Sequence, residues 1–160
     1  MAEVTRDDQD CLRLSFRLTG DIAALVLPAA VEPLRTDGLW RHTCFEAFVG
    51  AANSPEYWEF NFSPSGAWAA YHFVGYRAGM EPVDAATAPI IARESGVAEF
   101  SLEVTLDLGW LLRTHAGAGL RLGLTAVIED RIQGLSYWAL KHGADKPDFH
   151  RADSFLVALA

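Results

Sequence analysis

Residues 40–73 read WRHTCFEAFVGAANSPEYWEFNFSPSGAWAAYHF, and this stretch decides the fold. Residues 44–49 alternate between two faces with the period of 2 that is typical of a β-strand. Residues 57–63 alternate in the same way, with aromatic side chains on one face and Glu59 and Asn61 on the other. The turn Ser63-Pro64-Ser65-Gly66 has Pro and Gly where a type I turn favours them, so the chain returns antiparallel. We therefore predict three consecutive strands with one apolar face and one face that carries carboxylates.

Short strands separated by Gly, Pro and Asx turns continue on both sides of this stretch. They are predicted at residues 11–19, 22–27, 90–93, 99–106, 120–129, 135–140 and 154–159. Because the run 22–27 is continuously apolar, we expect a strand covered on both faces. Residues 74–88 form a long loop, and one or two helical turns are expected at 107–114. The sequence contains no segment with the composition of a linker, so a single domain over residues 1–160 is expected. The pattern of short strands predicts an all-β fold, an antiparallel β-sandwich of jelly-roll type.

The charge balance restricts the partners. The net charge is −8, from 13 basic and 21 acidic residues, and such a chain repels phosphate backbones and anionic lipid. We therefore expect no nucleic acid and no membrane partner, and a neutral polar ligand or a cation instead. The acidic start of the chain does not resemble a secretory signal, and Cys11 and Cys44 are expected as free thiols. A disulfide between them would fit only an exported protein, and we expect a cytoplasmic one.

The central motifs resemble a known family. WRHTCFEAF and YWEFNFSPSGAWAAY, followed by SYWALKH and PDFH, are similar to DOMON-like domains related to family 9 carbohydrate-binding modules. Within that group the chain most resembles the bacterial subgroup associated with a peptidoglycan-precursor reductase, over nearly its whole length. The resemblance implies a β-sandwich and a saccharide ligand, with a cell-wall amino sugar as the first candidate. Other DOMON relatives bind haem, so the resemblance alone does not define the function.

A binding surface for a small polar ligand is expected on the polar face of the central strands. Sugar sites combine flat aromatic faces with hydrogen-bonding groups, and Glu46, Glu59 and Asn61 supply the latter. Three contacts in the loop 141–148 follow from the resemblance. The candidate ligand contacts are Trp40, His42, Glu46, Glu59, Asn61, Tyr71, Trp138, Lys141, His142 and Asp148. Trp58 and Trp110 are expected in the core.

Several alternatives remain open on the same residues. The polar face could be a solvated sheet surface without a ligand. Glu46 and Glu59 could act as the acid and base of glycoside cleavage, and His42, Cys44 and Glu46 share the face that a zinc site would need. We favour a non-catalytic domain without metal or cofactor, because no nucleophile elbow and no phosphate loop is present.

Two further readings concern haem and protein partners. A haem site would need Met80 and His150 as axial ligands, and the polar residues around both predict that no haem binds. An interaction domain or homodimer is the other alternative, since the apolar run 22–27 and the strand 154–159 would need cover at a sheet edge.

Overall fold

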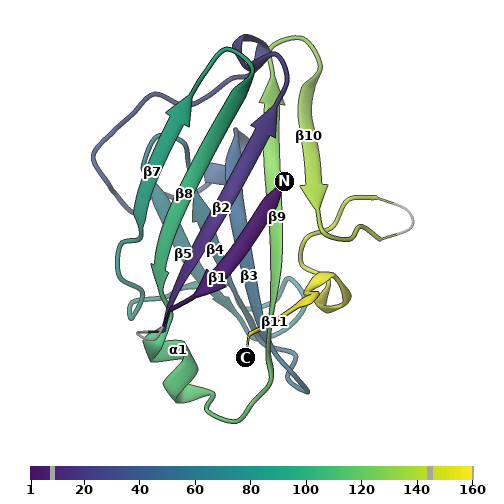
Figure 1. Ribbon diagram of the computed structural model, residues 1–160. Coiled ribbons are helices and arrows are strands. Elements are labelled where there is room, and N and C mark those ends of the chain that lie inside the picture. Colours follow the sequence, from purple (N-terminus) through teal and green to yellow (C-terminus); the bar gives the residue numbers. More distant parts are fainter. Residues whose placement is uncertain (8–9, 144–145, 160) are drawn as a thin grey trace.

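The computed structural model describes residues 1–7, 10–143 and 146–159, and their regular secondary structure is almost all β-strand. The strands are β1 (Ala2–Arg6), β2 (Cys11–Thr19), β3 (Cys44–Ala51), β4 (Tyr57–Phe62), β5 (Trp68–Phe73), β6 (Glu81–Pro82), β7 (Ile90–Ser95), β8 (Glu99–Asp107), β9 (Leu120–Asp130), β10 (Gly134–Ala139) and β11 (Val157–Leu159). One α-helix, α1 (Gly109–Thr114), lies at one end of the molecule (Figure 1). In the described part of the chain, none of the helices is long and apolar enough to cross a membrane.

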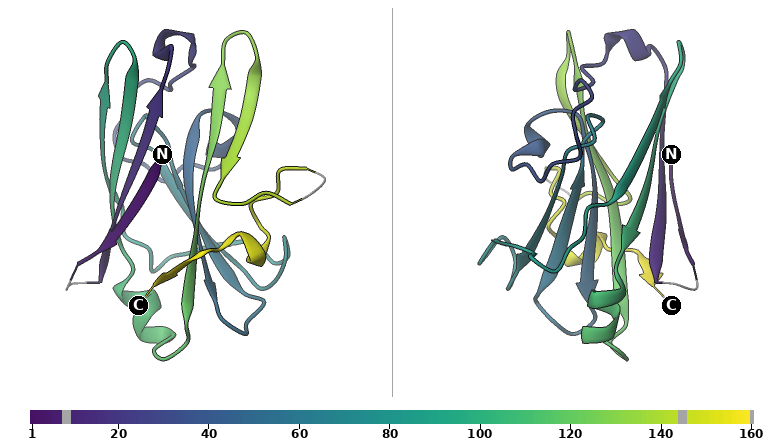
Figure 2. Two further views of the ribbon diagram at one scale, coloured as in Figure 1. Left: turned by 45° about the vertical axis from the view of Figure 1, so that its right-hand side comes forward. Right: turned by 90° about the vertical axis from the view of Figure 1, so that its left-hand side faces the viewer.

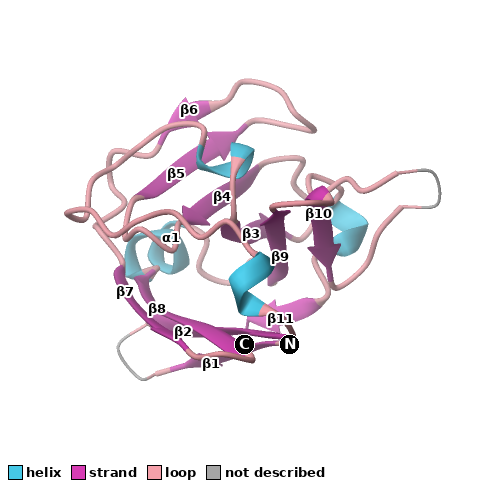
Figure 3. Cartoon of the chain, turned by 90° about the horizontal axis from the view of Figure 1, so that it is seen from above, coloured by secondary structure: helices cyan, strands magenta, loops and turns pink. Residues whose placement is uncertain are grey.

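Two antiparallel sheets pack face to face (Figure 3). The four-stranded sheet has the order β1-β2-β8-β7, and the seven-stranded sheet has the order β10-β9-β3-β4-β5-β6, with β11 beside β9. The predicted all-β sandwich is confirmed, whereas its jelly-roll connectivity stays a prediction. The three central strands β3, β4 and β5 form in the predicted stretch. The predicted turn after β4 is closed by a hydrogen bond from the Gly66 amide to the Ser63 carbonyl.

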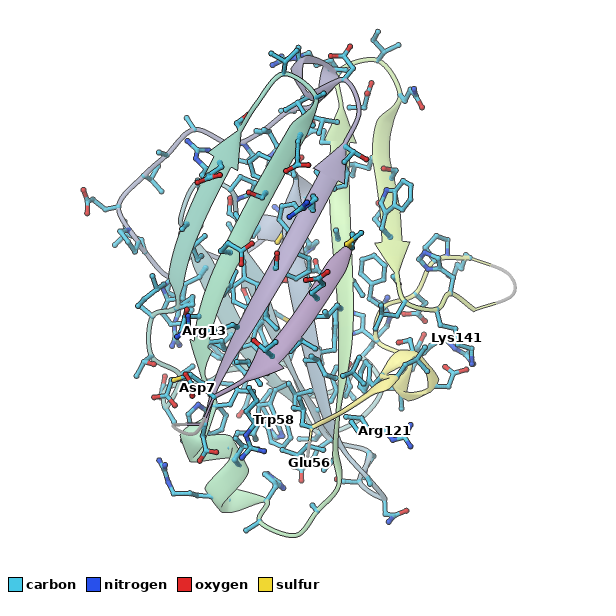
Figure 4. The ribbon with its side chains drawn as sticks, in the orientation of Figure 1. Asp7, Arg13, Glu56, Trp58, Arg121 and Lys141 are labelled. Atoms are coloured by element: carbon cyan, nitrogen blue, oxygen red, sulfur yellow. The ribbon has the colours of Figure 1, made fainter. Side chains whose placement is uncertain are left out.

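The main core lies between the sheets because alternate residues of each strand point inward. The seven-stranded sheet contributes Phe45, Phe60 and Phe62, and the four-stranded sheet contributes Leu14 and Leu102. Trp58 belongs to this core as predicted, and Trp110 packs against it from α1. In Figure 4, Trp58 lies near the end of the sandwich that carries α1.

Among the first elements, one predicted strand is wrong and one observed strand was not predicted. The run 22–27 does not form a strand, because residues Ile22–Ala24 adopt a 3₁₀ turn that Asp21 caps by accepting a hydrogen bond from the Ala23 amide. Only Leu25 makes an isolated bridge, to Asp130 of β9. By contrast, the polar start of the chain does form a strand, since Ala2–Arg6 pairs along β2 through its backbone.

The outer face of the seven-stranded sheet is covered as well. Every residue of β3 and β4 is buried, on both faces. A second apolar cluster forms there around Phe48, Tyr57, Phe73 and Phe155. Part of the cover is the 3₁₀ turn Leu39–Arg41, which Figure 2 (right) shows on the side away from the four-stranded sheet. The polar face of the meander is therefore an interior surface, and the alternative of a solvated sheet face is wrong.

Cys11 and Cys44 form no disulfide with each other, because Cys11 lies on β2 and Cys44 on β3 of the other sheet. Burial raises the pKa of Cys44 well above its usual value. Because the thiolate is the reactive form, we expect Cys44 to resist Ellman's reagent until the protein unfolds. A Cys11→Ser variant isolates this thiol, and its native form should give no colour while its urea-unfolded form gives full colour. Rapid reaction of the native variant would contradict the packing around Cys44.

Candidate functional site

A cavity of about 370 Å³ lies on the outer face of the seven-stranded sheet. Its volume is within the range of small-molecule sites. The strands contribute Glu46 from β3, Glu59 from β4 and Val127 from β9. Most of the remaining wall is aromatic, and loops complete it: these lining residues are Trp40, Phe73, Arg77, Met80, Tyr137, Pro147, Asp148, Phe149 and His150.

The two glutamates face the cavity because of the strand register. Glu46 is paired with Asn61 across β3 and β4, and Glu59 is paired with Phe48, so the two carboxyl groups occupy diagonal positions on one face. Glu46 is only 2% exposed and Glu59 only 5%. Thr125 of β9 donates a hydrogen bond of 3.0 Å to Glu46 Oε2, and Asn61 Nδ2 donates one of 2.7 Å to Glu59 Oε1.

Burial makes both carboxyl groups weak acids. Burial and, to a smaller extent, the nearby Glu59 charge together raise the pKa of Glu46 to about 8, against the opposing hydrogen bond from Thr125. Burial likewise raises the pKa of Glu59 to about 7, although the Asn61 hydrogen bond and the Arg77 charge oppose it. A carboxyl group in an apolar site keeps its proton because the ion loses its hydration there. The floor of the cavity is therefore an acid pair that titrates close to neutral pH.

The C-terminal segment closes one side of the cavity through His150. The Nδ1 atom of His150 lies 2.8 Å from the Tyr57 hydroxyl, and its Nε2 atom lies 3.9 Å from Glu59 Oε2. Burial, with a smaller contribution from the Arg77 charge, lowers the pKa of His150 to about 4. His150 is therefore neutral at neutral pH and leaves the negative charge of the glutamates uncompensated.

Arg77 and Asp148 hold two loops together at the rim. The Arg77 guanidinium donates to Asp148 Oδ1 at 2.9 Å, and the Tyr76 hydroxyl donates to Asp148 Oδ2 at 2.6 Å. Although burial opposes it, these hydrogen bonds lower the pKa of Asp148. Arg77 has a φ of 52°, in the left-handed region, and its amide donates to the Tyr57 hydroxyl at 3.1 Å. Strained non-glycine backbone of this kind concentrates at ligand sites.

Of the predicted contacts, Trp40, Glu46, Glu59 and Asp148 line the cavity. Asn61 lies beneath it as the hydrogen-bond partner of Glu59. Tyr71 is buried behind Trp40, whose ring it meets edge to face at 5.9 Å, and its hydroxyl donates to Asp37.

The other predicted contacts lie away from the cavity. His42 is exposed and pairs with Glu129 at 2.8 Å, and Lys141 pairs with Asp153 at the outer edge seen in Figure 4. His142 stacks behind Phe149. Positions 144 and 145 of the same loop lie outside the described residues.

On β10 the cavity residue is Tyr137, whereas its neighbour Trp138 points the other way. Tyr137 is paired with Val127, a cavity residue, but Trp138 is paired with Ala126 of the core face. Trp138 is 64% exposed and lines a separate apolar cavity of about 230 Å³ at the open edge of the sandwich. Exposed apolar residues on an edge strand are typical of a pairing surface, so the homodimer stays a prediction.

The residues considered for a zinc site do not come together in the described part of the chain, whereas those considered for a haem site line one cavity. Among the described residues, no group of three or more His, Cys, Asp and Glu could hold a metal ion, and His42 turns towards Glu129 instead of Glu46. Met80 and His150, by contrast, both line the cavity. His150 Nδ1 is engaged by the Tyr57 hydroxyl, whereas its Nε2 atom lies 3.9 Å from Glu59 Oε2. The absence of haem stays a prediction.

Sequence reasoning missed several lining residues: Phe73, Arg77, Tyr137 and Phe149. Phe73 was assigned to its strand, and it follows Tyr71 by two residues, so strand alternation would have placed it on the same face. Arg77 gave no signal, because only the fold of its loop brings it to Asp148.

Comparison with known proteins shows the fold. No family model and no curated protein matches the chain. Among solved structures it is similar to a protein from Bacteroides uniformis described as a "putative carbohydrate-binding protein", with a TM-score of 0.65 and 16% sequence identity. The match covers 96% of this chain and 74% of that one. At this identity the likeness shows the fold alone, a β-sandwich. In this chain the sandwich carries a half-open cavity lined by acidic and aromatic residues.

Proposed function

We propose that this protein is a non-catalytic binding domain for a saccharide or a similar polar small molecule. One observation carries the proposal: two carboxyl groups lie on the floor of a cavity whose walls are largely aromatic. The flat apolar face of a sugar ring packs on aromatic side chains, while its hydroxyl groups donate to carboxylate oxygens. Trp40 and Tyr137 are placed for the first contact, and Glu46 and Glu59 for the second.

The similarity to a carbohydrate-binding candidate supports this proposal. So do the motifs of residues 40–73, which resemble DOMON-like domains related to family 9 carbohydrate-binding modules. We propose membership of that DOMON-like group on these grounds. Cysteines that form no disulfide fit a reducing compartment, so we further propose a cytoplasmic location.

Replacement of Trp40 tests whether a saccharide binds in this cavity or elsewhere on the surface. For saccharides that bind the wild type in a calorimetric panel of mono- and disaccharides, Trp40→Ala should weaken binding by about tenfold or more, since a stacking face is lost. Trp138→Ala is the matched control, because that tryptophan lies outside the cavity, and it should leave the affinity unchanged.

Two outcomes would contradict the proposal. If no saccharide in the panel binds with a Kd below about 1 mM, the cavity is not a sugar site. If a bound oligosaccharide is hydrolysed and Glu59→Gln abolishes the hydrolysis, the acid pair is catalytic and the domain is an enzyme.

A further inference from the structure

Within the described part of the chain, no lysine or arginine forms an ion pair with the acid pair on the cavity floor. Of the described residues that line the cavity, only Arg77 and His150 are basic. Arg77 pairs with Asp148 at 2.9 Å, and His150 is held neutral by burial. Buried carboxylates in proteins are normally paired with a cation or a metal, so this arrangement lacks one partner.

Both carboxyl groups also retain acceptor capacity. Within the described residues, Glu46 accepts one hydrogen bond, at Oε2 from Thr125, and none reaches its Oε1 atom. Glu59 accepts from Asn61 at Oε1, while its Oε2 atom is 3.9 Å from His150 Nε2, beyond hydrogen-bond distance. Each buried glutamate thus offers one oxygen to a donor that enters the cavity.

An ammonium group would supply both the missing positive charge and donors for the two carboxyl oxygens that accept no hydrogen bond from the described residues. It carries three donors and a full positive charge, and charge-assisted hydrogen bonds are about twice as strong as neutral ones. Hydroxyl groups would fill the same acceptors without neutralising the charge. The aromatic faces of Trp40 and Tyr137 add a favourable surface for a cation in the same cavity.

We propose that the ligand carries a protonated amine, which binds between Glu46 and Glu59, so that an amino sugar is preferred over its neutral counterpart. This inference rests on the proposed function for the position of the site and names the chemical class of its ligand. The amine would displace the proton that the acid pair holds, because an adjacent positive charge favours the ionised carboxylates.

Proton release gives the proposal a second readout. With pKa values of about 8 and 7, the two glutamates together retain between one and two protons at pH 7. The other titratable groups that face them are Cys44, Tyr57, Tyr71, Arg77, Asp148 and His150. The shifts in their pKa values keep all of these outside the range between pH 6.5 and 8. A proton released at pH 7 therefore comes from the acid pair.

Matched ligand pairs test the inference by calorimetry at pH 7. The pairs are glucosamine with glucose, galactosamine with galactose, mannosamine with mannose, and ethanolamine with ethylene glycol. In at least one pair the amine should bind about tenfold tighter or more. In buffers of different ionisation enthalpy, only the amine should show proton release. Glu46→Gln and Glu59→Gln should each abolish the preference, and Glu103→Gln, on the exposed face of the four-stranded sheet, should keep it.

The outcomes separate this inference from the proposed function. Equal affinity within every pair of sugars, without proton release, would overturn the inference and leave saccharide binding intact. Binding of ethanolamine but of no sugar would overturn saccharide binding and support the amine site. If nothing binds in any pair, both are overturned. A preference that survives both glutamine variants would place the amine elsewhere and overturn the inference.

Discussion

The free energy of unfolding should fall by about 2 kcal/mol as the pH rises from 6.5 to 8. The reason is the acid pair, because the pKa values of Glu46 and Glu59 are raised from 4.5 to about 8 and about 7 in the folded protein. Between these values the folded state binds more protons than the unfolded chain. The contribution to stability is therefore fully present below pH 4.5 and is lost as the pH rises through the folded pKa values.

His150 sets the lower limit of this pH window. Burial lowers its pKa from 6.5 to about 4, so its contribution to stability is present above pH 6.5 and is lost as the pH falls towards 4. Below pH 6.5 the effects of His150 and the glutamates oppose each other. Above it, only the glutamates of this cavity still titrate.

Urea unfolding followed by tryptophan fluorescence at a series of pH values measures the effect. The double variant Glu46→Gln/Glu59→Gln should flatten the profile between pH 6.5 and 8, because an amide does not titrate there. Glu103→Gln should keep the slope of the wild type, since this glutamate is exposed on the other sheet. A flat wild-type profile would show that both carboxyl groups ionise in the folded state as they do in water.

Gly123→Ala should destabilise the protein by about 1–3 kcal/mol, the usual effect of an extra methyl group in a packed interior. The Phe155 ring lies across Gly50 and Gly123 on neighbouring strands. A Cβ atom at Gly123 would lie 2.8 Å from Phe155 Cδ1, and one at Gly50 would lie 2.8 Å from Cδ2. Neither glycine has a positive φ, so the requirement for glycine here is steric.

The same substitution should weaken ligand binding, because the Phe155 ring anchors the segment that carries Asp148 and His150. If Phe155 moves outward, the wall of the cavity moves with it. Thermal unfolding and calorimetry on Gly123→Ala measure both effects. Gly96→Ala is the matched control, since a Cβ atom there makes only an ordinary contact of 3.5 Å with Glu99. Wild-type stability and affinity for Gly123→Ala would contradict the anchoring role of Phe155.

The sequence by itself determined most of the strands and the two faces of the central meander. Period-2 alternation located β2 at its observed bounds, because this strand has one face in the core. The same rule placed Glu46, Glu59 and Asn61 together. It failed at residues 22–27, where a short apolar run fits a strand and a buried turn equally well, and Asp21 capped the turn. It also missed Ala2–Arg6, a strand held by backbone pairing instead of side-chain pattern.

Only the tertiary structure decided that the polar face is covered and lines a half-open cavity. Its cover comes from Trp40, Arg77 and the segment around His150, which lie far from the glutamates along the chain. Alternation reports which residues share a face, but it carries no information about what packs on that face. For the same reason, Tyr137 and Trp138 could not be told apart before the register with β9 was known, since a shift of one residue exchanges the two faces of a strand. The raised pKa values follow from this burial, because the loss of water, and not the residue type, makes the two glutamates weak acids.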